Sequence, residues 1–154
     1  MSPEELMQGL VGRWAGTVRT WFEPGVLADE SPVSGEFACV LNGRFVRHTY
    51  TGQIQGKPRH GEELMAFNAI TKQWQVSWID SFHMSQAIMF STGPSAESGF
   101  SVLGAYDAGE NLPQWGWRTE FQLVDGRHLI ITAYNITPEG ESAKAVETMY
   151  ERCS

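Results

Sequence analysis

The clearest structural signal in the sequence is the octapeptide QWQVSWID at residues 73–80. Trp74, Val76 and Trp78 occupy every second position, and Asp80 continues their face. Successive side chains of a β-strand point to opposite sides, so this alternation predicts a strand with one dry face.

The same pattern recurs in QWGWRTEFQL at residues 114–123, where Trp115, Trp117 and Phe121 share one face. Short runs rich in β-branched and aromatic residues fill most of the chain, separated by Gly, Pro, Asn and Asp about every dozen residues. We therefore predict ten strands, at residues 13–22, 34–42, 44–53, 60–68, 73–80, 85–92, 99–106, 114–123, 127–136 and 143–152. Turn signals such as Asn42-Gly43 indicate antiparallel neighbours. Residues 23–33 are predicted to form the one long loop.

The N-terminus carries helix signals. Ser2 can cap a helix, Pro3 suits the first helical position, and Glu5 completes a Ser-x-x-Glu capping box. Leu6 and Leu10 then fall on one face. This predicts a short helix whose apolar face covers one end of the structure built by the strands.

Ten strands in meander order leave two exposed edges in an open sheet, and closure into a barrel removes them. We predict an all-β fold, an antiparallel up-and-down barrel of about ten strands, with the short helix closing one end and residues 1–154 forming a single domain. A barrel of this strand number encloses a cavity unless it is flattened. The alternative is a two-sheet sandwich with a solid core.

Composition narrows the function classes. With 11 basic and 18 acidic residues, the formal charge of −7 disfavours nucleic acid as a partner. The chain has no apolar run of about 20 residues and begins without a secretory signal, so we expect a cytoplasmic protein without a membrane partner. The two cysteines and four histidines show no ligand spacing, so neither a metal nor a cofactor is predicted. A homodimer is one assembly that stays open.

The two ends of the chain suggest how the barrel closes. Residues 12–16 read GRWAG, and residues 149–152, close to the C-terminus, read MYER. This arrangement resembles the calycin pattern of lipocalins and fatty-acid-binding proteins, in which a Trp of the first strand lies under a basic side chain of a late strand. If the first and last strands pair antiparallel, Arg152 meets the Trp14 indole in a cation–π contact with a structural role.

A longer set of motifs is similar to an uncharacterised bacterial lipocalin-like family known as a domain of unknown function, and the similarity spans nearly the whole chain. The motifs are Gly12-x-Trp14, Leu41-Asn42-Gly43-Arg44-Phe45, Tyr50-x-Gly52, Gly56-x-Pro58-x-x-Gly61 and Trp78-Ile79-Asp80-Ser81. The sequence departs from the family pattern at Ala66-Phe67-Asn68, where an aromatic residue followed by Asp and Asn is more usual. The resemblance implies the barrel and supplies no activity.

A neighbouring relative is the nitrobindin-type haem barrel, which also has ten strands. Its glycine-rich opening, ending in a Tyr-Pro pair after the Trp, is missing here. Haem binding is therefore the weaker alternative, and His128 is the histidine to test for it.

The candidate binding residues lie on the predicted dry faces. We expect Trp74, Trp78, Trp115 and Trp117 to form an aromatic wall around a small apolar or amphipathic ligand. The ligand's polar end would be held by Asp80, Tyr50 or Tyr134. The same tryptophans could instead simply fill the interior.

An enzymatic alternative uses the same cavity. Asp80 and His83 could form an acid–base pair in an isomerase or a hydrolase, although we assign no catalytic residue. The segment 59–63 carries Arg59, His60, Glu62 and Glu63, which we interpret as a surface ion-pair cluster. Within it, alternation places Glu63 with the dry residues and the pair of His60 and Glu62 on the opposite side. His48 shares a predicted strand face with Tyr50.

Overall fold

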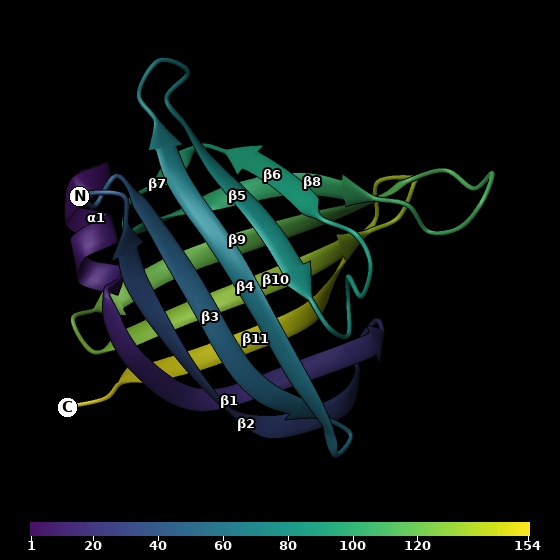
Figure 1. The fold of residues 1–154 in the computed structure, drawn as a ribbon. Helices are drawn as coiled ribbons and strands as arrows, with labels where there is room; N and C mark the ends of the chain where they lie inside the picture. The colour runs from purple at the N-terminus through teal and green to yellow at the C-terminus, as the bar shows by residue number, and fades with distance from the viewer.

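The computed structural model describes residues 1–154 as one α-helix and a β-barrel (Figure 1). The elements are α1 (Pro3–Leu10), β1 (Gly12–Glu23), β2 (Val26–Val40), β3 (Phe45–Ile54), β4 (Lys57–Asn68), β5 (Gln73–Asp80), β6 (Met89–Gly93), β7 (Ser95–Ala96), β8 (Gly99–Tyr106), β9 (Trp115–Asp125), β10 (His128–Ile136) and β11 (Ser142–Arg152).

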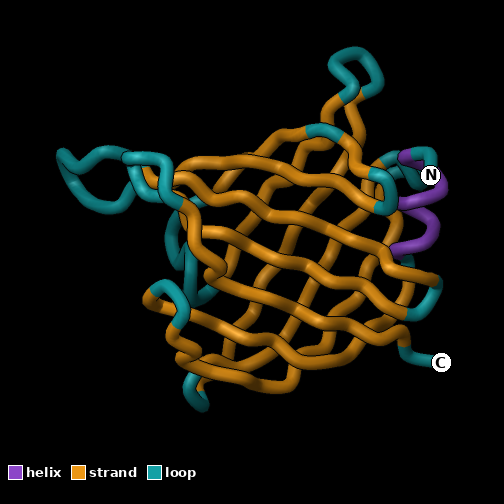
Figure 2. The backbone as a smooth tube through the Cα atoms, turned by 180° about the vertical axis from the view of Figure 1, so that it is seen from behind, coloured by secondary structure: helices purple, strands orange, loops and turns teal.

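All neighbouring strands pair antiparallel, in the order β6-β5-β4-β3-β2-β1-β11-β10-β9-β8-β7, and a β6–β8 pairing closes the ring. The two-residue β7 pairs only with β8, so ten strands form the barrel. In the tube view, the strands of the near wall cross those of the far wall at an angle, as expected for the two sides of a barrel (Figure 2). The predicted barrel is confirmed, and closure excludes the sandwich.

The first and last strands lie side by side, with Trp14 opposite Arg152. The Arg152 guanidinium carbon lies 4.3 Å from the centre of the Trp14 ring. Arg152 also donates hydrogen bonds to the carbonyls of Gly9, Val11 and Gly126. One side chain thus links the end of α1, the first strand and the β9–β10 turn.

The helix forms where the capping residues predict it. Ser2 Oγ accepts a hydrogen bond from the Glu5 N–H at 3.1 Å, and Leu6, Met7 and Leu10 are buried. The Trp14 indole N–H donates to the Leu10 carbonyl at 2.8 Å, which fixes α1 against one end of the barrel. We call this the helix end and the opposite one the loop end. Spanning eight residues, α1 is the one helix of the structure and lacks the length and apolarity needed to cross a membrane.

Two predicted boundaries are wrong. Residues 23–33 do not form a long loop, because Gly25 adopts a positive φ of 76° in a tight turn and β2 begins at Val26. Pro32 is tolerated in β2 because there the strand pairs with β1 alone, its pairing with β3 beginning at Val33. The strand predicted at 85–92 begins only at Met89, since the segment after Asp80 is held in a turn.

The half of the interior next to the helix is filled by stacked aromatic rings. Trp74 is fully buried and lies 4.3 Å, centre to centre, from Phe100, which in turn lies 4.5 Å from Phe121. The Trp74 indole N–H is satisfied by Ser95 Oγ at 2.9 Å. This half is a packed apolar core, so any space for a ligand lies toward the loop end.

Candidate functional site

Two adjacent chambers occupy the interior between the barrel's middle and its loop end. The inner chamber has a cavity volume of about 50 Å³ and lies among polar and apolar side chains from nearly every strand. The outer chamber, about 190 Å³, opens toward the loop end beside Phe22, Phe82 and His83. Trp78, Trp117 and Met89 line both, so they form the boundary between the chambers.

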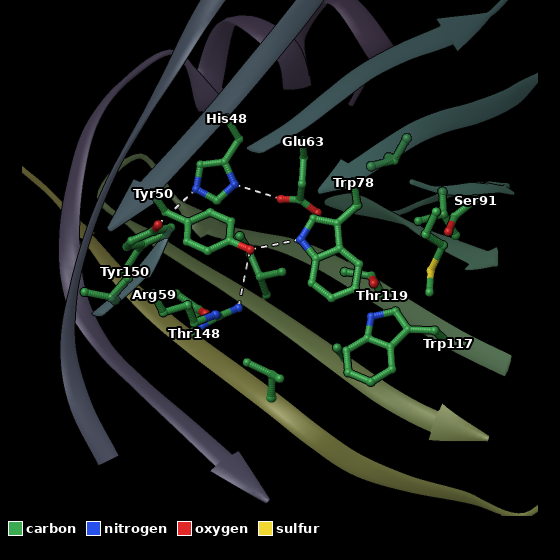
Figure 3. Close-up of a pocket in the computed structure, with 17 residues that line it drawn as sticks. His48, Tyr50, Arg59, Glu63, Trp78, Ser91, Trp117, Thr119, Thr148 and Tyr150 are labelled. Carbon is green, nitrogen blue, oxygen red and sulfur yellow. Dashed lines mark hydrogen bonds and ion pairs between the residues drawn. The ribbon is translucent and has the colours of Figure 1, made fainter. Parts of the chain in front are cut away.

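The predicted aromatic wall is only half present. The Trp78 and Trp117 rings stack 5.4 Å apart with an angle of 21° between their planes (Figure 3). Trp74 belongs to the packed helix half, and Trp115 lines a separate pocket near Trp21 outside both chambers. Strand alternation holds for Trp115, but its position at the start of β9 puts it beyond the cavity.

Tyr134 lies outside both chambers. It follows a register shift in β10 between Ala133 and Tyr134, and its ring packs under the Arg118 guanidinium at 4.4 Å. Ala133 lines the inner chamber instead. Tyr134 is therefore not among the residues placed to hold a ligand's polar end.

Tyr50 lines the inner chamber, but its hydroxyl is already engaged. It donates to Asp80 Oδ2. It also accepts from the Trp78 indole N–H at 2.9 Å (Figure 3). Arg59 donates its Nε–H to the same Asp80 oxygen at 2.9 Å, and its guanidinium lies 4.8 Å from the centre of the Tyr50 ring. These residues form a closed network at the wall of the chamber.

Asp80 is a structural anchor rather than an accessible carboxylate. Its side chain has no exposed area, and its Oδ1 accepts the backbone N–H groups of Phe82 and His83 at 2.7 Å each. Burial would raise the pKa of Asp80, but His83, the Arg59 charge and the Tyr50 hydroxyl together hold this pKa well below its ordinary value. Both oxygens are occupied, so nothing remains for a ligand.

Burial raises the pKa of the Tyr50 phenol well above its ordinary value, because the charged form would lose its solvation. The Arg59 charge acts in the opposite direction, while Asp80 adds to the increase. Tyr50 therefore stays a neutral hydrogen-bond donor at any physiological pH.

A second polar chain crosses the chamber and was not among the predicted site residues. His48 Nδ1 lies 2.8 Å from Glu63 Oε1, and His48 Nε2 lies 2.9 Å from the Tyr150 hydroxyl. All three are buried and line the inner chamber (Figure 3). Burial raises the pKa of Tyr150, and the neighbouring Glu63 charge raises it further.

Two glycines make room for these networks. A Cβ at Gly61 would collide with the Tyr50 hydroxyl, and one at Gly35 would collide with the Tyr150 hydroxyl and approach His48 Nε2 to 3.0 Å. The sequence motifs contain Gly61, but its role shows only when β3 and β4 are paired, since Tyr50 stands opposite Gly61 in the ladder.

Two residues of the segment 59–63 do not belong to a surface cluster: Arg59 and Glu63 are only 5% and 7% exposed. For Glu63 this confirms the inward direction that strand alternation predicts, whereas the surface position expected for Arg59 is wrong. His60 and Glu62 point outward, as alternation predicted. The inward charges are tolerated because each has a partner from an adjacent strand: Asp80 for Arg59 and His48 for Glu63.

Asp80 and His83 come together without forming an acid–base pair. Between the two side chains, Asp80 Oδ1 and His83 Nδ1 are 3.6 Å apart, too far for a hydrogen bond, and Nδ1 has no other partner. Burial lowers the pKa of His83, with Arg59 adding to the decrease and Asp80 opposing it. His83 lines the outer chamber whereas Asp80 lines neither, so the geometry supports no catalytic role for the pair.

The residue suggested for haem lies far from the chambers. The His128 side chain, 53% exposed, pairs with Asp125 across the β9–β10 turn at the helix end. His128 is therefore not placed to bind a haem iron inside the barrel. No group of three or more His, Cys, Asp or Glu side chains is arranged to hold a metal ion.

By its fold and its site, the protein belongs to the class of closed antiparallel β-barrels that contain an internal chamber, here lined by tryptophan and polar side chains. The chain belongs to the family of proteins of unknown function DUF1579, whose model matches residues 1–152. No curated protein matches the sequence.

Among solved structures, the barrel is similar to the S-type phycobiliprotein lyase CPES from Guillardia theta. The TM-score is 0.63 at 13% sequence identity, covering 100% of this chain and 94% of the other. A protein of unknown function from the DUF3598 family of Nostoc punctiforme aligns over 99% of this chain and 100% of its own, at 9% identity, but its TM-score of 0.28 carries no argument. At these identities the likeness extends to the fold alone.

Proposed function

We propose that the protein binds a small apolar or amphipathic molecule in the two chambers. The observation that carries this proposal is the contrast within one barrel: the helix half is packed with stacked rings, while the loop half keeps two adjacent chambers, one on each side of an aromatic boundary. A preformed cavity lined by apolar side chains and a few buried polar groups is typical of a ligand site.

The two volumes constrain the ligand's shape. The inner chamber, about 50 Å³, has room for roughly three or four water molecules, and hence for a ligand's polar end. The outer chamber, about 190 Å³, would take a ring or a short chain against Trp78, Trp117 and Phe82. A large multi-ring ligand fits neither chamber as the structure stands.

Binding energy would come mainly from the aromatic boundary. Burial of apolar surface contributes about 25 cal/mol per Å², less the cost of ordering the ligand. Trp78 is held in place by its hydrogen bond to Tyr50, and its stacking on Trp117 keeps both rings oriented. A preorganised wall of this kind reduces the ordering cost on the protein side.

The likeness to a phycobiliprotein lyase supports the proposal at the level of the fold. That protein shows that a barrel of this shape is compatible with a role other than structural packing.

The test uses 4-phenylbutan-1-ol, a neutral probe with one ring and a short chain, and follows the six tryptophan indole N–H signals by NMR. We expect the signals of Trp78 and Trp117 to shift on titration while that of Trp115 stays in place. If no indole signal responds at millimolar probe, the binding proposal is wrong.

A matched pair of variants places the probe inside the barrel. Val102 lines the inner chamber and is 1% exposed, whereas its neighbour Leu103 is 55% exposed on the outer face. Val102→Phe should fill the chamber and weaken probe binding at least tenfold, and Leu103→Phe should leave it unchanged. Equal weakening by both variants would indicate a surface site.

A further inference from the structure

We propose that the ligand carries a primary amine and that Glu63 binds this amine at the inner chamber. The inference rests on the proposed function and specifies the chemistry of the ligand's polar end. It starts from the one carboxylate that lines the chamber and retains an oxygen without a protein partner.

One of the two carboxylate oxygens of Glu63 has no protein partner. Its Oε1 is 2.8 Å from His48 Nδ1, and its Oε2 has no hydrogen bond from any protein donor. The side chain is 9% exposed and lines the inner chamber (Figure 3). A carboxylate oxygen in such an enclosed place is stabilised strongly by a charged donor, and an ammonium is the compact one.

The other charges of the chamber do not compete for this role. Arg59 is the one cationic Arg or Lys side chain in the lining, and its Nε–H is paired with Asp80 at 2.9 Å. Its Nη2 is directed at the Tyr50 hydroxyl at 3.4 Å. Arg59 is thus neutralised by its own partner, whereas an anionic ligand would face the carboxylate of Glu63.

The rest of the polar lining also suits an ammonium. Ser91, Thr119 and Thr148 line the same chamber, and no protein hydrogen bond is made by their side-chain hydroxyls. A hydroxyl oxygen accepts hydrogen bonds, and an ammonium has three N–H donors to place. Glu63 together with such hydroxyls matches this donor count in a space of about 50 Å³.

The apolar remainder of the ligand would lie in the outer chamber. This chamber has nine hydrophobic residues among its eleven and lies directly beyond Trp78 and Trp117. The class of ligand is therefore an arylalkyl or short alkyl amine with its nitrogen innermost. A carboxylate such as a fatty acid has the wrong charge for this arrangement.

The test compares three probes that share one apolar body, a phenyl ring on a four-methylene chain: 4-phenylbutylamine, 4-phenylbutan-1-ol and 5-phenylpentanoate. Affinities for the unmodified protein are measured by titration calorimetry at pH 8, where the amine is still protonated. We expect the amine to bind about tenfold more tightly than the alcohol, and the carboxylate to bind most weakly. This comparison needs no variant and so does not depend on the folding of one.

Variants then assign the preference to one residue. Glu63→Gln keeps the size of the side chain and an oxygen for His48, and should reduce the amine-to-alcohol ratio to within about twofold. Glu62→Gln, one position along β4 and facing outward, should leave the ratio unchanged. A ratio that survives Glu63→Gln would show that another group binds the amine.

The outcomes separate the two proposals. Equal binding of amine and alcohol, or tightest binding of the carboxylate, overturns the amine inference while the chambers remain a binding site. Failure of all three probes to bind overturns the proposed function itself, and the amine inference with it.

Discussion

Strand β5 contributes a tryptophan to each half of the barrel, and the two have different surroundings. Trp74 lies in the helix half, fully buried between Phe67 and Phe100. Trp78, four residues later on the same face, donates to Tyr50 and lines both chambers. The same alternation thus builds a solid core at one end and the wall of a cavity at the other.

The difference between the halves comes from the neighbouring strands. In the helix half, β5 faces apolar partners such as Phe67, whereas in the loop half it faces Gly61 and Glu63 of β4. Glycine leaves space, and a charged side chain requires a partner that further fixes its position. Chambers persist where small and charged residues interrupt the apolar packing.

The largest effect that tests this contrast is the removal of a tryptophan from each half. We expect Trp74→Ala to lower the free energy of unfolding by about 3–5 kcal/mol, as for other buried aromatic truncations. Trp117→Ala should cost at least about 1 kcal/mol less, because one side of its ring faces the chambers and has fewer atoms to lose. Urea denaturation measures both. Equal losses would mean that the two halves are packed alike.

The second effect concerns the buried charges of the loop half. Asp80→Asn leaves Arg59 buried without its counter-charge and should destabilise the fold by about 3 kcal/mol. The control is Glu30→Gln in the exposed Arg19–Glu30 pair, where the N···O distance of 3.0 Å is nearly the same but the loss should stay below about 1 kcal/mol. If both variants lose the same amount, burial does not distinguish the pairs.

The fold was predictable because its signals are local. Alternation at 73–80 gave the bounds of β5, and Ser2 with Glu5 gave the start of α1. The loop predicted at 23–33 is wrong, because Pro32 is compatible with a strand at a position where β2 has a partner on one side only.

The site was less predictable because it depends on pairing between strands. Alternation placed Glu63 inward, yet a charge at that position is credible only when His48 is known to stand opposite it on β3. The same holds for Gly61 and Tyr50. Trp115 shows the converse limit: a residue on the correct face still misses the cavity when it lies too near the end of its strand.

A smaller effect tests the space that glycine provides. Gly61→Ala would bring a Cβ into the Tyr50 hydroxyl and disturb its bond to Asp80, so we expect a loss of about 1–3 kcal/mol. Gly52→Ala, on the neighbouring strand β3, would place its new Cβ 3.3 Å from the nearest atom and should cost clearly less. Thermal unfolding of the two variants gives the comparison. A larger loss at Gly52 would contradict the role assigned to Gly61.

The smallest effect is the pH dependence contributed by His83 at the boundary of the loop half. Because burial lowers the pKa of this histidine in the folded state, the unfolded chain takes up the proton first as the pH falls below the ordinary value of 6.5. Stability is therefore full above pH 6.5 and declines below it, by at most about 1.4 kcal/mol per pH unit, until the folded pKa is reached. Asp80 acts in a different pH range. Because its pKa is lowered in the folded state, it contributes stability above about pH 3.8, and this contribution is lost only below that pH. Measurements between pH 5 and 7 thus separate the contribution of His83 from that of Asp80.

The free energy of unfolding in this range should become less pH-dependent in His83→Gln. The control His60→Gln, which alters an outward-facing histidine, should follow the unmodified protein. An unchanged slope in His83→Gln would mean that the ring takes up its proton as easily in the barrel as in water, and that the loop half is more open to solvent than its chambers indicate.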